Sequence, residues 1–164
     1  MVINGATAGV WILSYFGTYF IMFIGEYQHV IDEKGRIALP TKFRKDLSAG
    51  VVVTKGLDHC LWVYPKKEWN TLATKLSTLP ISQSQNRSFI RLMLAGAMDL
   101  IIDKQGRINI PQYLTDFSGL KKGVIIAGLY NRLEIWNEKA WETYKKTMEK
   151  ESTQIADSLS ELGI

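Results

Sequence analysis

The chain has 164 residues, of which 46% are hydrophobic and 22% charged, a composition that suits one modest domain with a core of its own. Its single cysteine, Cys60, excludes a framework of internal disulfides, fits a reducing compartment and is predicted to be a small buried apolar side chain. The formal net charge of +4 permits an anionic partner but does not require one.

The N-terminal residues 1–25 are unusual because they contain no Asp, Glu, Lys or Arg. They have neither the basic n-region nor the small-residue cleavage site of a secretory signal. The uncharged stretch is long enough to span a bilayer, but Asn4, Ser14, Thr18 and several glycines dilute its hydrophobicity.

A short stretch then organises the rest of the chain, because it occurs twice. Asp32–Pro40 reads DEKGRIALP, and Asp103–Pro111 reads DKQGRINIP. Further matches follow with the spacing increased by one residue: Gly56-Leu57 with Gly128-Leu129, Leu61 with Leu133, Val63 with Ile135, and Trp69 with Trp141. The chain therefore contains two copies of one small unit, and neither copy is large enough to bury a core alone.

Each copy is predicted to form two short strands around a tight turn. Mostly apolar, largely β-branched residues at 29–31 and 100–102 favour the first strand, and alternating aliphatic residues over 37–39 and 108–110 favour the second. Proline ends each second strand because it cannot donate to a ladder, and it can open a following helix.

The turns between these strands are predicted to be shaped by Asp and Gly. Asp32 and Asp103 can accept backbone N–H bonds at the start of each turn, and Gly35 and Gly106 supply the positive φ that such connections usually need. Four cations then stand at or beside the protruding turns: Lys34, Arg36, Lys104 and Arg107.

Two roles are open for Arg36 and Arg107. Each can form an ion pair with the Asp of its own turn, or it can contact a phosphate or a base edge of DNA from a rigid support. Exposed ion pairs are common and contribute little stability, so the turn alone does not decide between these roles. One arginine can also serve both, with the Asp orienting it.

A short helix is predicted after the first repeated stretch, with Phe43 and Leu47 on one face. Three cations lie elsewhere on it: Lys42, Arg44 and Lys45. Beside a DNA-facing turn they would add phosphate contacts and salt dependence. The matching segment of the second copy, 112–117, has no basic residue, so we expect the first half to contribute more to DNA affinity.

Each copy continues with a pair of buried strands and an apolar helix. The strands are predicted at 51–54, 61–64, 124–126 and 133–136. The helices carry apolar stripes that we expect to be core rather than a stacking platform for single strands: Trp69, Leu72 and Leu76 in the first copy, and Trp141, Tyr144 and Met148 in the second.

Between the copies, Leu79-Pro80 stops one helix, and a polar stretch precedes a strongly apolar helix that carries Phe89 and Met93. We expect this helix and the Trp69 helix to form a contact between subunits, so that a charge at Met93 would lower the mass of the assembly. The C-terminal segment keeps the spacing of a final amphipathic helix at Ile155, Leu159 and Leu162.

The repeated motifs resemble those of the MraZ family, bacterial regulators in the AbrB/SpoVT superfamily. The resemblance rests on twin Asp-x-x-Gly-Arg-aliphatic-x-aliphatic-Pro motifs, each followed by a Gly-Leu…Leu-x-aliphatic-aromatic strand, and it runs from about Met22 to about Met148. It includes Phe23-Ile24-Gly25-Glu26-Tyr27 near its start and Glu134-Ile135-Trp136 near its end.

The resemblance implies an α+β fold with a mainly β core, an intramolecular double swapped-hairpin, AbrB-like β-barrel of two pseudo-symmetric repeats with flanking helices. It also implies ring-like homo-oligomers that bind tandem DNA repeats upstream of the division and cell-wall gene cluster. Chains of this family start near Met22, so we expect residues 1–21 to be a misassigned start or an extension outside the barrel. Further divisions are expected at 26–68 for the first repeat, 69–96 for connecting helices, 97–140 for the second repeat and 141–164 for a helical tail.

An enzyme is disfavoured by the residues present. His29 and His59 belong to different elements, and the sequence has no His-x-x-His, Cys-x-x-Cys, nucleophile elbow or glycine-rich phosphate loop. Asp32 and Asp103 could pair as a carboxylate dyad, but each has an Arg four residues on, which suits an ion pair better. A non-catalytic structural or antitoxin-like protein-binding module stays open, because other members of the wider superfamily bind a toxin as well as DNA.

The sequence and the resemblance together predict a cytoplasmic, nucleoid-associated transcriptional regulator that binds double-stranded DNA as a homo-oligomer, with no membrane, metal or cofactor. The residues expected to bind DNA are Lys34, Arg36, Lys42, Arg44, Lys104 and Arg107, with Asp32, Gly35, Asp103 and Gly106 shaping the turns. DNA binding further predicts a single face that holds Lys34, Arg36, Lys42, Lys104 and Arg107. Scattered cations would favour the scaffold.

Overall fold

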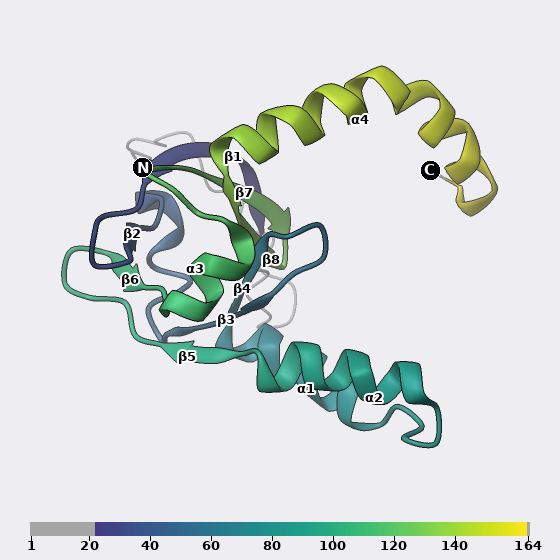
Figure 1. The fold of residues 1–164 in the computed structure, drawn as a ribbon, viewed down its shortest axis with the longest axis horizontal. Helices are drawn as coiled ribbons and strands as arrows, with labels where there is room; N and C mark the ends of the chain where they lie inside the picture. The colour runs from purple at the N-terminus through teal and green to yellow at the C-terminus, as the bar shows by residue number, and fades with distance from the viewer. Residues whose placement is uncertain (1–21, 164) are drawn as a thin grey trace, which may run out of the picture.

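The computed structural model describes residues 22–163 and shows a mixed α+β fold, with antiparallel strands in the body and helices around it (Figure 1). The strands are β1 (Phe23–Val30), β2 (Arg36–Ala38), β3 (Val51–Lys55), β4 (Leu61–Pro65), β5 (Met98–Leu100), β6 (Arg107–Asn109), β7 (Gly123–Tyr130) and β8 (Arg132–Asn137). The helices are α1 (Lys66–Ser77), α2 (Ser84–Ile90), α3 (Gln112–Ser118) and α4 (Glu138–Leu159), with short 3-10 or π turns η1 (Thr41–Phe43), η2 (Arg91–Ala95) and η3 (Ser160–Leu162). The extension predicted over residues 1–21 lies outside the described residues.

The main sheet has six strands in the order β1-β7-β8-β4-β3-β5, and each pairing in it is antiparallel. β4 and β8 pair at its centre, and an approximate two-fold axis passes between them. This axis relates β4 to β8, β3 to β7 and β5 to β1. β2 and β6 form a separate two-stranded sheet. Within residues 22–163, the strand pairing therefore does not close a barrel.

The strand partners at the repeated stretch differ from the prediction. The pattern predicts that residues 29–31 and 37–39 form a hairpin within one copy, but β1 pairs with β7 and β2 pairs with β6, both from the other copy. Of the hairpin predicted within the first copy, the described residues retain one isolated antiparallel β-bridge, between Ile31 and Ile37. Pairing across the copies sets Ile37 opposite Ile108 and buries both fully, which one copy could not do alone.

One hydrophobic core joins the two sheets. It contains inward-facing residues of both copies, among them Ile37 and Ile108 from the small sheet and Leu61 and Leu133 from the large one. The alternation of apolar residues along these strands is the pattern that the sequence predicted. The core is therefore a joint product of both copies rather than two separate cores.

A smaller cluster lies on the other face of the large sheet. Cys60 is buried there beside Trp136, and burial raises the pKa of its thiol to about 12. The cysteine is therefore a protonated core residue, as expected. The ring centroids of Trp141 and Trp136 lie 5.3 Å apart, and those of Trp69 and Tyr64 lie 6.0 Å apart in the matching place, so both tryptophans pack on the sheet as predicted. The prediction that the whole stripe is core is wrong for Tyr144, which is 38% exposed.

Met93 itself lies in the core of its own chain and cannot take part in the expected contact between subunits, whereas a contact through the exposed parts of its helix and of the Trp69 helix stays a prediction. Met93 is only 1% exposed, and its carbonyl accepts a hydrogen bond from Oγ1 of Thr54 at 2.7 Å. The apolar helix that carries it folds back onto β3 of the same chain, so its apolar side chains are partly used by the fold itself.

Two predicted helices have different lengths in the structure. After Pro40 the chain forms the 3-10 turn η1 and further turns instead of a helix through Leu47, although Phe43 and Leu47 are both buried as expected. At the C-terminus, α4 runs unbroken to Leu159, so the predicted final helix is a continuation of the Trp141 helix. Within residues 22–163, no helix combines the length and the hydrophobicity needed to cross a bilayer.

Candidate functional site

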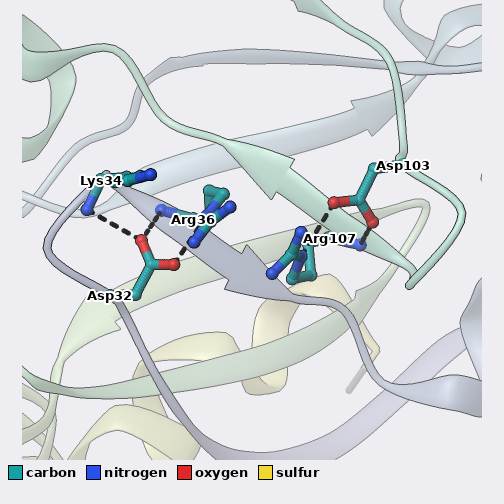
Figure 2. Close-up of polar contacts among 5 residues, drawn as sticks. All are labelled: Asp32, Lys34, Arg36, Asp103 and Arg107. Atoms are coloured by element: carbon teal, nitrogen blue, oxygen red, sulfur yellow. Dashed lines mark hydrogen bonds and ion pairs between the residues drawn. The ribbon is translucent and has the colours of Figure 1, made fainter.

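The two repeated turns share one hydrogen-bond pattern (Figure 2). In the first, Oδ1 of Asp32 accepts the backbone N–H groups of Lys34 and Arg36, each at 2.9 Å, and Oδ2 accepts from Nε of Arg36 at 2.6 Å. In the second, Asp103 and Arg107 repeat the backbone bond at 2.9 Å and the Nε bond at 2.8 Å. One carboxylate thus shapes each turn and orients its arginine.

The two turns also hold each other across the copies. Gly35 and Gly106 both have φ of +77°, a backbone conformation that favours glycine. The carbonyl of Gly35 accepts the N–H of Ile110 at 2.8 Å, and the carbonyl of Gly106 accepts the N–H of Leu39 at 2.9 Å. A Cβ on Gly35 would lie 2.8 Å from the backbone oxygen of Ile110, so this turn requires a residue without a side chain.

Both arginines lie on the outward face of the small sheet. Ile37 stands opposite Ile108 and both point into the core, so the residues on either side of them point away from it. We call this outward set the arginine face: Arg36, Ala38, Arg107 and Asn109. In this register the two arginines are diagonal neighbours, for which the Cα atoms lie about 7–8 Å apart. Figure 2 shows them side by side between the two Asp carboxylates.

Each arginine keeps hydrogen-bonding capacity for a ligand. Within residues 22–163, Nε of Arg36 and of Arg107 donates to the Asp of its own turn, and the Nη groups have no protein partner. The side chains are 34% and 28% exposed. A guanidinium that is held at Nε and open at its Nη atoms can donate to a phosphate or to a guanine edge without further ordering.

The carboxylates of the turns are held in the ionised form. The backbone N–H of Arg36, together with its guanidinium and the N–H of Lys34, lowers the pKa of Asp32 below its usual value. The backbone N–H of Arg107 and its guanidinium lower the pKa of Asp103 in the same way. Both ion pairs therefore persist throughout the physiological pH range.

We expect both turns to keep their structure as the pH falls from 7 to about 4, because an Asp with a lowered folded pKa contributes fully above its unfolded pKa of about 3.9. This contribution is lost as the pH falls through the lower folded value. In an NMR titration, the backbone N–H signals of Arg36 and Arg107 should shift with midpoints below about 3.9. In Asp32→Asn the Arg36 signal should stop titrating while that of Arg107 still does. A midpoint above about 4 in the unaltered chain would contradict the bonding pattern.

The structure places the other turn cations differently from one another. Lys34 and Lys104 are exposed on the two turns. Lys42 instead extends over β1, with Nζ 4.9 Å from the ring centroid of Tyr27, a cation–π arrangement. Lys42 is exposed as well, so its predicted contact with phosphate stays a prediction.

Arg44 has a role that the sequence did not reveal. Its Nε donates to the carbonyl of Leu39 at 2.9 Å, and its guanidinium lies directly against Gly106 of the other copy. Burial, followed by the charge of Arg44, lowers the pKa of His29. Arg44 therefore braces the second turn from the first copy, a contact that no local pattern predicts because it depends on pairing across the copies.

Asn109 is the residue of the arginine face that the sequence reasoning missed. It stands opposite Arg36 in the register of the small sheet and is exposed. The signal was present, because alternation along 107–109 puts Arg107 and Asn109 on one side. Asn can donate to and accept from a base edge, so it adds an uncharged group to the face.

Sites for other ligands are less well formed. Among residues 22–163, no three or more His, Cys, Asp or Glu side chains come together as a metal site. A hollow of about 450 Å³ between β1 and α4 is lined largely by charged side chains that include Glu26, Glu138 and Lys145. It belongs to other elements than the arginine face.

Comparison with known proteins accounts for the duplication. A family model described as "MraZ protein, putative antitoxin-like" matches the chain twice, over residues 22–92 and 93–161. The chain belongs to the MraZ family. Each MraZ unit contains one repeated turn, and the two units meet inside the π turn η2.

Curated relatives match across the MraZ part of the chain. A protein of Halothermothrix orenii is 48% identical, one of Natranaerobius thermophilus is 43% identical, and one of Acetivibrio thermocellus is 45% identical, each over 143 residues. Each alignment covers 87% of this chain and 100% of the relative. All three relatives are named Transcriptional regulator MraZ.

Proposed function

We propose that this chain is a transcriptional regulator that binds specific sequences of double-stranded DNA through its arginine face and the two turns. The observation that carries the proposal is the pair Arg36 and Arg107, which lie on one outward face with their Nη groups open. The names of its relatives support regulation of transcription as the role. No catalytic step forms part of this proposal.

The turns give the arginines a rigid support. Asp32 and Asp103 fix the guanidinium groups before any ligand arrives, which lowers the ordering cost of a bidentate contact. We assign base edges or adjacent backbone to the arginines, and phosphates to Lys34 and Lys104 at the turn tips. Lys42 and Arg44 are proposed as further phosphate contacts, and both also have a place in the fold through their contacts with Tyr27 and Gly106.

The proposal includes assembly of several chains into a ring that binds tandem repeats upstream of the division and cell-wall gene cluster. One chain presents one small basic face, which suits weak binding to one repeat. Several faces on one assembly would bind several repeats with high effective concentration, so affinity would rise steeply with repeat number. The expected location is the cytoplasm, on the nucleoid.

We further propose that the two sheets together make a double swapped-hairpin barrel. The support is that strands of each copy pair with the other copy and that one core joins both sheets. The bonds from Ile110 to Gly35 and from Leu39 to Gly106 tie the turns into this arrangement. The proposed units are 26–68 and 97–140, with connecting helices at 69–96 and a helical tail at 141–164.

Binding of the full chain to labelled DNA from its own upstream region tests the function. We expect tight binding by fluorescence anisotropy, a steep loss of affinity with salt, and weaker binding to a single repeat or to scrambled DNA. Arg36→Ala and Arg107→Ala should each weaken binding by about 1–3 kcal/mol per site, or roughly 5- to 150-fold. Lys34→Ala should mainly flatten the salt dependence.

Lys139→Ala, an exposed cation on α4, is the matched control and should bind as the unaltered chain does. Circular dichroism would verify that the arginine variants are folded. Equal binding to native and scrambled DNA would contradict sequence specificity. Absence of binding by every form would favour the antitoxin-like protein-binding module, in which the Asp–Arg pairs serve only to pin the turns.

A further inference from the structure

Two helical arms project from the body of the chain (Figure 1). One is the α1–α2 hairpin together with η2, residues 66–95, which we call the hairpin arm. The other is the distal half of α4, residues 149–159, which we call the tail arm. Lys145 holds the proximal half of α4 to β1 through Glu26 at 3.0 Å, and beyond that point the helix runs away from the sheet.

The tail arm carries an uncovered apolar stripe. Ile155 and Leu159 of the tail arm and Leu162 of η3, which directly continues it, follow one another at intervals of four and three residues, so they lie on one side of the helical segment. Ile155 is 36% exposed and Leu162 is 71% exposed. From Lys150 on, each side chain that the structure describes is exposed except that of Leu159. A helical segment of this length is marginal in water without packing partners.

The hairpin arm presents a second apolar surface at a fixed tip. Asn86 donates to the carbonyl of Pro80 at 2.9 Å, and Arg87 donates to the carbonyls of Ile81 and Ser82 at 2.7 and 2.9 Å. These bonds hold the connecting loop while Ile81 remains 72% exposed. Phe89 on α2 is 36% exposed. Such a preorganised tip loses little entropy on binding.

The charges of the two arms are opposite. The hairpin arm contains five cations, Lys66, Lys67, Lys75, Arg87 and Arg91, against the single anion Glu68, for a net charge of +4. The tail arm contains three anions, Glu149, Glu151 and Asp157, against the single cation Lys150, for a net charge of −2. Lys75, Arg91, Glu151 and Asp157 are all exposed.

We propose that the tail arm of one copy docks on the hairpin arm of a second copy, head to tail. Both surfaces are apolar and exposed, their charges are complementary, and they are different parts of one chain. A contact between two different surfaces is heterologous, so each bound copy leaves one arm open for the next. Repetition gives the proposed ring where the rotation between neighbouring copies closes, and an open filament where it does not. The contact thus rests on the ring of the proposed function and names the surfaces that build it.

A charge-exchange experiment on the full chain tests this contact by light scattering after size exclusion. The hairpin variant is Lys67→Glu with Lys75→Glu and Arg91→Glu, all at exposed positions, which changes the net charge of the hairpin arm from +4 to −2. The tail variant is Glu151→Lys with Asp157→Lys, which changes the net charge of the tail arm from −2 to +2. Each variant alone pairs like charges at every contact and should fall to the mass of a single chain. An equal mixture should regain the mass of the unaltered assembly, because alternating copies restore opposite charges at every contact.

The matched control is Lys121→Glu with Lys122→Glu and Lys139→Glu, which changes the net charge as the hairpin variant does but at exposed positions outside both arms. It should keep the full mass. The proposal is overturned if the unaltered chain is a monomer, if either variant keeps the full mass, or if the mixture stays dissociated. Anisotropy with a single-repeat DNA separates the two proposals. If the arginine face reads DNA, the dissociated hairpin variant should still bind one repeat, with the affinity of the matched control that carries the same net charge.

Discussion

Neither half of the chain will fold as a monomer when residues 22–92 and 93–164 are produced separately. β1 and β2 of the first half pair with β7 and β6 of the second, and β5 of the second half pairs with β3 of the first. Each half alone would keep one hairpin, β3–β4 or β7–β8, and expose its share of the common core. A lone hairpin is marginally stable at best in water.

Sedimentation and circular dichroism would measure this outcome. Each half should be either unfolded or associated with another half, and mixing the two halves should restore the spectrum and the cooperative unfolding of the full chain. Since the two copies are alike, two molecules of one half could form a homodimer in which each takes the place of the missing copy. A half that is both monomeric and cooperatively folded would contradict the shared core.

Ile37→Ala should destabilise the whole chain by about 2–5 kcal/mol, a large part of the roughly 5–15 kcal/mol that a domain of this kind has available. Ile37 is fully buried and stands opposite Ile108 where the small sheet meets the core. Removing its side-chain carbons loses their transfer free energy and leaves a cavity. Because the core is shared, unfolding in urea should stay a single transition with a lower midpoint.

Ile108→Ala should have a similar effect, because the approximate two-fold axis gives it the same surroundings and it is also fully buried. Ile101→Ala is the control: Ile101 is 84% exposed, so its loss should change the free energy of unfolding by no more than about 0.5 kcal/mol. Two separate transitions in Ile37→Ala would show that the halves unfold independently, which a single core built from both copies does not allow.

The sequence specified the turns more completely than the strand partners. Asp32, Gly35 and Arg36 each have a local reason for their identity, and the bonds found in the structure are those that these residue types make nearby. Alternation of Ile37 with its neighbours likewise predicted which side of the strand faces the core. These features follow from interactions within a few residues.

Partners distant in sequence could not be read in the same way. A strand pattern defines two faces but not the strand that pairs along the edge, so a hairpin within one copy and an exchange between copies look alike. The contact of Arg44 with Gly106 depends on that choice, because it joins the first copy to the turn of the second. The outward position of Arg36 and Arg107 was predictable from the alternation of their strands, whereas the contact of Arg44 with the turn of the other copy was not.

The pairing of β1 with β7 has a consequence for synthesis of the chain on the ribosome. Phe23 lies opposite Tyr130 and Val30 opposite Gly123, so the first strand is made about 100 residues before its partner. At about 5–20 residues per second, the emerging strand waits about 5–20 seconds without a ladder. During that time the strands of a neighbouring nascent chain on the same messenger would offer the same pairing edge. Chains translated side by side are therefore exposed to exchange with one another before each has closed on itself.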